Sequence, residues 1–134
     1  MVDLLFSWPP NGGADVDLYH VVKELDKQGA ALKLFVLQFE NIPGRGQVKP
    51  EAMPFPVEVV RVSSRNQHHR HVTETIRNAV DAWQPDLVWL AHGYALKPHV
   101  ALALAHYPLI GRYYAHEMLC ARNGLRYRDN APCP

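Results

Sequence analysis

The chain has 134 residues and a mass of 15.2 kDa, and hydrophobic residues make up 48% of it. This length fits one domain spanning residues 1–134, with enough apolar side chains for a core that needs neither metals nor disulfides. The net charge of +1, with no run of basic residues, excludes nucleic acid as the expected partner.

The first residues predict neither a secretory signal nor a membrane span. They read MVDLLFSWPPNGG, with an acidic residue at Asp3, no basic segment and only a short apolar run. Cys120 and Cys133 are the two cysteines, and so few cysteines without a signal favour free thiols over a disulfide framework. We therefore expect a cytoplasmic globular protein without a transmembrane segment.

An apolar run and an amphipathic helix open the chain. Residues 3–8 predict a short strand, which the Pro-Pro-Asn-Gly-Gly turn at 9–13 closes. The next apolar residues recur at i, i+4, i+7, i+8 and i+11, which predicts an amphipathic helix that Gly29 ends. Asp15 and Asp17 lie near its start, where the helix dipole favours negative charge. Its inner stripe consists of Ala14, Leu18, Val21, Val22 and Leu25.

The rest of the chain predicts four more strands and two more helices. Residues 32–39 are nearly all apolar, typical of a strand buried on both faces, whereas 57–62 carries two charges and lies nearer an edge. The helical spacing recurs over 72–83, and Pro85 stops that helix. The remaining expected elements are a strand at 87–90, a helix at 97–106 buried on several sides, and a strand at 109–114.

This order of elements is typical of an open parallel sheet with helices between its strands. We therefore predict an α/β fold, a Rossmann-like three-layer domain with a mainly parallel sheet of about five strands.

One connection is irregular, because residues 40–56 hold four prolines and two glycines without a helical period. A loop of this length is often functional, and we expect it to be mobile.

In such sheets ligands gather beyond the carboxyl ends of the strands. Five of the eight histidines fall at that edge, which indicates either a polar rim or ordinary loop positions. The first three form an H-H-x-H run, and a solvated loop explains this run better than zinc, because residues at the mouth of one helix do not converge into a tetrahedron. The five are His68, His69, His71, His92 and His116.

The Gly12-Gly13 pair lies between the first strand and the first helix. It either lets the backbone approach a phosphate at the helix start or merely forms a tight turn. The G-x-G-x-x-G spacing of a dinucleotide enzyme is lacking, although Glu40 stands where the ribose-binding acid would be. His116, after the last predicted strand, can donate a hydrogen bond or carry a proton at neutral pH, or it can simply cap the strand end.

Three segments together resemble the N-terminal domain of retaining GT-B glycosyltransferases of the family-four group, which use nucleotide sugars. The segments are PPNGGADVDLYHVVKELDKQG, QPDLVWLAHGY and PLIGRYYAHEMLC. The shared features are a P-x-x-G-G turn that opens a helix, a P-D-h-V-h-h-H strand (h apolar) and a last strand followed by H-E. The resemblance covers essentially the whole chain.

The resemblance implies roles at the reacting centre. Gly12 and Gly13 would approach the diphosphate or the sugar of the donor. His116 would be the catalytic residue that hydrogen-bonds the transferring sugar. Glu117 would contact substrate where the family usually has Asp. Backbone N–H groups at the helix start would stabilise the leaving diphosphate, so the resemblance implies no metal and no cofactor besides the nucleotide sugar.

The resemblance also implies an acceptor side of the cleft, lined by His92, Gly93 and Tyr94. The nucleotide-binding half of such enzymes would follow this domain, and the chain stops at Pro134 without it. We therefore expect an acceptor-side domain that is inactive without a C-terminal GT-B domain or a partner chain. The alternative is a stand-alone Rossmann-like binding or interaction module without catalysis. The face that would meet the missing half is exposed, so self-association is also expected.

Overall fold

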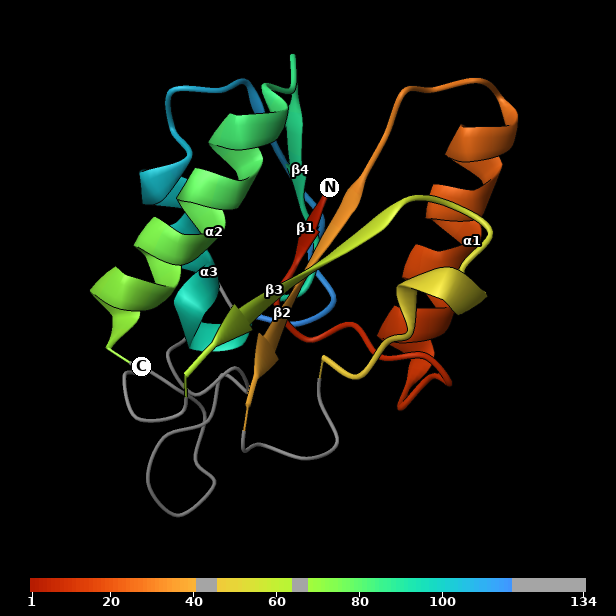
Figure 1. Cartoon of the computed structure of the whole chain (residues 1–134), viewed down its shortest axis with the longest axis horizontal. Coiled ribbons are helices and arrows are strands. Elements are labelled where there is room, and N and C mark those ends of the chain that lie inside the picture. Colours follow the sequence, from red (N-terminus) through yellow and green to blue (C-terminus); the bar gives the residue numbers. More distant parts are fainter. Residues whose placement is uncertain (41–45, 64–67, 117–134) are drawn as a thin grey trace.

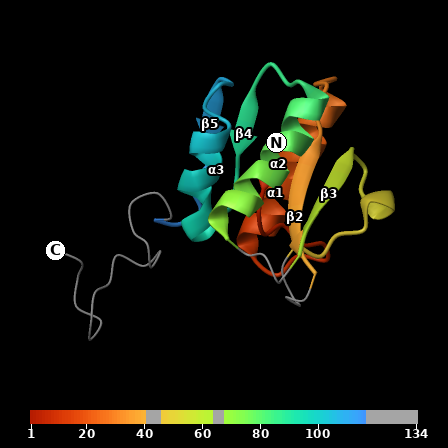
Figure 2. The same cartoon turned by 60° about the vertical axis from the view of Figure 1, so that its left-hand side comes forward.

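The computed structural model describes residues 1–40, 46–63 and 68–116, and the description below concerns these ranges (Figure 1). Five parallel strands form one sheet in the order β3-β2-β1-β4-β5. The two ends of this order, β3 and β5, lie on opposite sides of the molecule (Figure 2). The strands are β1 (Val2–Asp3), β2 (Leu34–Phe39), β3 (Val57–Val62), β4 (Val88–Leu90) and β5 (Leu109–Gly111).

Three helices cover the sheet, α1 (Gly13–Lys27) on one face and α2 (His69–Trp83) with α3 (Lys97–Ala103) on the other (Figure 1). Connections between parallel strands are right-handed. The step from β1 to β2, through α1, runs toward one edge of the sheet. The steps from β3 to β4, through α2, and from β4 to β5, through α3, run toward the other edge, so α1 lies on the face opposite to α2 and α3. The predicted α/β Rossmann-like fold with a five-stranded parallel sheet is confirmed.

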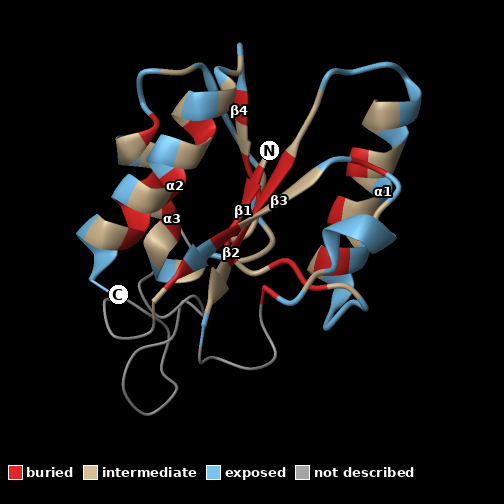
Figure 3. Ribbon diagram, in the orientation of Figure 1, coloured by how far each residue is buried: buried red, intermediate tan, exposed pale blue. Residues whose placement is uncertain are grey.

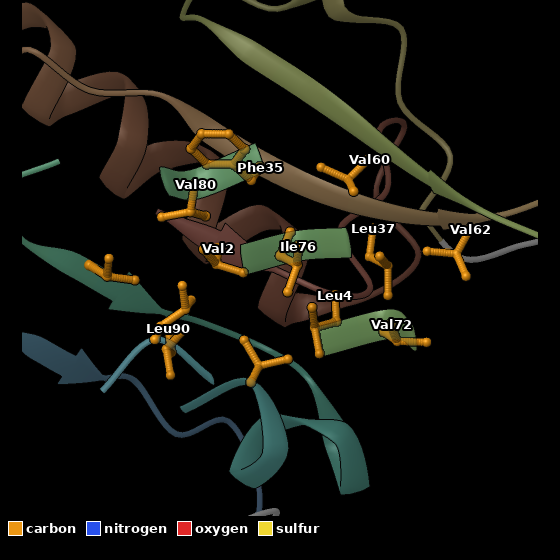
Figure 4. Close-up of a cluster of buried hydrophobic side chains, with 13 residues drawn as sticks. Val2, Leu4, Phe35, Leu37, Val60, Val62, Val72, Ile76, Val80 and Leu90 are labelled. Carbon is orange, nitrogen blue, oxygen red and sulfur yellow. The ribbon is translucent and has the colours of Figure 1, made fainter. Parts of the chain in front are cut away.

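Side chains of β2 alternate between the two halves of the core, as the pleat of a strand requires. Leu34 and Val36 pack on the α1 side, where Leu18 of the helix stripe is fully buried. Phe35 and Leu37 point to the other side, toward the buried residues of α2 (Figure 4). Figure 3 shows the same result for the described residues, with buried residues between sheet and helices. The prediction that β2 is buried on both faces is confirmed.

The connection between β2 and β3 packs on the α1 side of the sheet. Residues 41–45 of this connection lie outside the described ranges. Its later part contains a short 3₁₀ helix, η1 (Pro50–Ala52), and the buried ring of Phe55. The Phe55 ring lies 5.7 Å from the Tyr19 ring of α1, so this segment covers apolar surface although no helical period predicts it.

The predicted ends of three elements are wrong. β1 ends at Asp3 instead of residue 8, because the Asp3 carboxylate accepts hydrogen bonds from the N–H groups of Leu5 and Phe6 and turns the chain out of the sheet. β5 ends at Gly111, three residues early. The last helix ends at Ala103, and its Leu102 is 76% exposed, so α3 is covered on one side instead of several.

No helix within the described ranges combines the length and apolar character needed to cross a membrane.

Candidate functional site

The site predicted from the sequence lies where the order of the strands reverses. β1 is flanked by β2 on one side and by β4 on the other. The helix that leads from β1 to β2 and the helix that leads from β3 to β4 lie on opposite faces of the sheet. At such a switch point the two connections diverge and leave a crevice beyond the carboxyl ends of the strands. The segments after β1, β4 and β5 meet at this edge, which we call the carboxyl edge.

Asp3 joins two of these segments. Its Oδ1 accepts hydrogen bonds from the N–H groups of Leu5 at 2.8 Å and Phe6 at 2.7 Å, and its Oδ2 accepts one from the N–H of His92 at 3.0 Å. Burial raises the pKa of the Asp3 carboxyl to about 7; the three backbone hydrogen bonds oppose this rise, and the nearby Asp15 charge adds to it. The carboxyl therefore fixes where β4 ends relative to β1.

Asp15 fixes the loop that precedes α1. Its carboxylate accepts hydrogen bonds from the N–H of Ser7 at 3.2 Å and from the N–H of Asn11 at 2.8 Å. Each of these bonds links the first turn of α1 back to the segment after β1. The loop is thus held by a side chain of the helix that it introduces.

Gly12 and Gly13 open α1 to solvent. Gly12 is the residue before the first helical turn, and no side chain caps the turn there. A Cβ atom built on either glycine would meet nothing within 4 Å. Packing therefore does not require glycine at these two positions, and the space above them is open to a ligand.

Asp17 joins α1 to the segment after β5. Its carboxylate lies 2.8 and 2.7 Å from the guanidinium of Arg112 and accepts a hydrogen bond of 2.7 Å from the hydroxyl of Tyr114. Burial and this hydrogen bond raise the pKa of the Tyr114 hydroxyl above its usual range. The third segment of the carboxyl edge is therefore anchored to the start of α1.

Aromatic rings bring the predicted acceptor-side residues together. The His92 ring lies 4.6 Å from the Tyr94 ring and 5.9 Å from the Tyr114 ring. Tyr94 has a φ of 46°, a left-handed backbone conformation that costs free energy in a residue with a side chain. Such backbone strain gathers at functional sites, and here it falls on a residue that the sequence predicts to line the cleft.

Gly93 packs tightly against its neighbours. A Cβ atom at this position would lie 2.9 Å from Cβ of Lys97 and 3.0 Å from Cδ1 of Leu4, so only glycine fits. The Lys97 side chain is itself buried, donates a hydrogen bond to the backbone oxygen of Arg112, and places its Nζ 4.4 Å from the centre of the Tyr113 ring. The buried side chain of Lys97 thus holds the segment after β5 through its hydrogen bond to Arg112 and its contact with the Tyr113 ring.

His116 is exposed, two residues beyond Tyr114, and forms no hydrogen bond or ring contact with another described residue. Its predicted catalytic role stays a prediction, and Glu117 lies outside the described ranges.

The rings of His68 and His69 lie 4.3 Å apart, and those of His69 and His99 lie 4.7 Å apart. Among the described residues, no three metal-binding side chains converge on one point.

The sequence-based prediction missed the charged residues that organise this edge. Asp15 and Asp17 are visible in the sequence only as acids near a helix start. Asp3 carries a clearer signal, since it is a single acid inside an apolar run, and a buried acid needs hydrogen-bond donors. No sequence pattern indicates the roles of Arg112 and Tyr114, because their contacts with Asp17 of α1 join residues 95 and 97 positions apart.

The fold defines the class, a Rossmann-like α/β domain whose carboxyl edge holds hydrogen-bonded polar and aromatic side chains. In comparisons with family models, curated proteins and solved structures, none matches this chain. The functional proposal therefore rests on the sequence motifs and on the geometry of the carboxyl edge.

Proposed function

We propose that the chain is the acceptor-side N-terminal domain of a GT-B glycosyltransferase. It contributes acceptor binding and part of the nucleotide-sugar site, and transfer requires a second, nucleotide-binding domain. The observation that carries this proposal is the open, uncapped start of α1 at Gly12-Gly13, on the same edge as the rings of His92 and Tyr94.

The α1 start supports the donor side of the proposal. A helix of 15 residues places the N–H groups of its first turn and the positive end of its dipole at the carboxyl edge. Transfer breaks the bond between the sugar and the diphosphate, so negative charge grows on the leaving oxygen. Backbone N–H groups that already point at this oxygen stabilise the charge without reorganisation.

The opposite wall supports the acceptor side. The rings of His92, Tyr94 and Tyr114 provide flat apolar surface with polar edges, which suits the stacking and hydrogen bonding of a hydroxyl-bearing acceptor. Asp3 and Asp17 hold this wall to β1 and α1 through hydrogen bonds. The wall is therefore fixed before any ligand arrives, which lowers the entropic cost of binding.

The test is a titration of nucleotide sugars into the isotope-labelled chain, followed by NMR. We expect weak binding of at least one of UDP-, GDP- and ADP-sugars, with amide shifts at Gly12, Gly13 and His116. Gly13→Ala places a methyl group in the open space and should abolish these shifts, while Lys27→Ala, at the far end of the same helix, should leave them unchanged.

A second measurement checks that the chain alone does not complete the reaction. We expect no turnover of a nucleotide sugar by the 134-residue chain. Robust turnover would contradict the need for a second domain. Absence of shifts at the α1 start with every donor, in a folded chain, would contradict the transferase assignment and favour an interaction module.

A further inference from the structure

Exposed apolar side chains gather at one end of the sheet. Among the described residues six large hydrophobic side chains are exposed. Five of these lie just before β4, on α3, in β5 or just after β5. The sixth, Val16, lies on α1. The five are Leu87 (47% exposed), Leu102 (76%), Leu109 (37%), Ile110 (45%) and Tyr113 (60%), and together with Gly111 we call them the β5 edge.

The backbone of β5 leaves hydrogen-bonding groups directed away from the sheet. β5 is the last strand in the sheet order and pairs with β4. The hydrogen bonds from the N–H of Val88 to the oxygen of Pro108 and from the N–H of Arg112 to the oxygen of Leu90 fix which residues face β4. In a parallel ladder these residues alternate, so Leu109 and Gly111 direct their N–H and C=O groups outward.

Within the described residues β5 has no charged side chain and no proline, although its length of three residues limits pairing. Sheets protect exposed edges with charged side chains, bulges or prolines within the strand. β5 reads Leu-Ile-Gly and has no charged residue. Two cations of the described segments next to β5 are engaged within the chain, because Arg112 pairs with Asp17 and Lys97 bonds to the backbone oxygen of Arg112.

We infer that β5 pairs with β5 of a second copy of this chain, forming a two-fold symmetric dimer. A two-fold axis perpendicular to the sheet makes the second strand antiparallel to the first. With the axis at Ile110, Leu109 of one copy lies opposite Gly111 of the other. Both residues direct their hydrogen-bonding groups outward, so two such pairs form four backbone hydrogen bonds.

Side chains fit this register on both faces of the joined sheet. The Tyr113 hydroxyl lies 2.8 Å from where a Cβ of Gly111 would be, so the Tyr113 ring covers Gly111 and offers a flat surface to Leu109 of the second copy. On the α1 side the two Ile110 side chains meet. They border a groove of about 590 Å³ in each copy, whose lining includes Leu25, Trp83, Leu87 and Trp89.

Charge and area are consistent with a second copy as the occupant. A two-fold axis brings each group near its own counterpart, so unpaired charges would repel, and the pairing of Arg112 with Asp17 removes the nearest one. A stable dimer buries roughly 800 Å² per partner, about a tenth of the 7945 Å² surface of this chain. The exposed side chains on both sides of β5 supply apolar area beyond the strand itself.

Sedimentation velocity over a range of concentrations tests the dimer. We expect the 134-residue chain to be dimeric, Ile110→Lys to be monomeric, and Val16→Lys to remain dimeric. The Ile110 amide bonds to β4 and its side chain is partly exposed, so the lysine should leave the fold intact, and circular dichroism checks this. A wild-type monomer at all concentrations would overturn the inference, as would a dimeric Ile110→Lys variant.

Cross-linking tests the register without a disruptive substitution. Residues opposite each other at the centre of this antiparallel pair have Cα atoms about 4.5 Å apart, within the range of a disulfide. In a chain with Cys120 and Cys133 replaced by serine, Ile110→Cys should therefore form a covalent dimer under mild oxidation, and Val16→Cys should not. Equal cross-linking of both variants would overturn the proposed register. The dimer does not depend on the proposed transferase function.

Discussion

The backbone N–H of His92 donates a hydrogen bond of 3.0 Å to the Asp3 carboxylate, 89 residues away in the chain. This bond crosses the switch point of the sheet and joins the carboxyl end of β1 to that of β4. The same carboxylate turns the chain out of β1 through Leu5 and Phe6. The buried carboxylate of Asp3 thus links the ends of β1 and β4 at the candidate site.

Stability should depend on pH through Asp3. Its pKa is raised from 3.8 to about 7 in the folded chain, so between these values the folded state binds more protons than the unfolded state. The free energy of unfolding should therefore fall as the pH rises through this window, by about 4 kcal/mol in total. Urea denaturation across the window, with Asp3→Asn as the control, measures this contribution.

Two results would support the Asp3 prediction. The side-chain carboxyl carbon of Asp3 should titrate near neutral pH in an NMR experiment, and Asp3→Asn should flatten the pH dependence of unfolding. Titration of Asp3 near its ordinary value of 3.8 would contradict the prediction, because the three N–H donors would then fully offset the effect of burial on the pKa.

Asp17→Asn should loosen the segment after β5. The substitution removes the charge that faces Arg112 and weakens the hydrogen bond from Tyr114. Because the pair is partly exposed, we expect a loss of about 1 kcal/mol in unfolding free energy. The pKa of Tyr114 should fall toward its ordinary value, since the contact with Asp17 contributes to its rise.

Absorbance titration of tyrosinate measures that shift, with Tyr114→Phe identifying the signal of Tyr114 among the six tyrosines. Asp26→Asn, at the other end of α1, is the matched control and should leave the titration unchanged. An unshifted Tyr114 in Asp17→Asn would show that burial alone sets its pKa.

Gly93→Ala and Gly13→Ala should differ in their effect on stability. The added methyl group at Gly93 meets Lys97 and Leu4 at 2.9 and 3.0 Å, and overpacking of this kind costs about 1–3 kcal/mol. The methyl group at Gly13 meets nothing within 4 Å, so its midpoint of thermal unfolding should stay the same or rise. Equal losses in the two variants would mean that the α1 start is packed more tightly than the structure shows.

Gln84→Gly should stabilise the protein. Gln84 follows α2 in a left-handed conformation with φ 52° and ψ 61°, which glycine adopts without a steric penalty. We expect a gain of about 1 kcal/mol in unfolding free energy. Gln28 follows α1 with φ −77°, so Gln28→Gly is the control and should gain nothing by chemical denaturation.

The sequence by itself determined the order and type of the elements. The stripe of α1, the buried run of β2 and the proline after α2 are local patterns, because a helix or strand buries one set of side chains at a fixed period. The role of Gly29 is also predicted from local sequence, since its φ of +83° is the left-handed conformation in which a residue ends a helix. These signals suffice for the fold class.

Only the tertiary structure decided which residues meet at the candidate site and what holds them together. The hydrogen bond from His92 to Asp3 and the ion pair between Arg112 and Asp17 join residues 89 and 95 positions apart, and no local period records such pairs. The exposed β5 edge is likewise a result of strand order, because Leu109 and Ile110 would be buried in a central strand. Sequence patterns report what one element buries, whereas contacts between elements depend on how the sheet assembles.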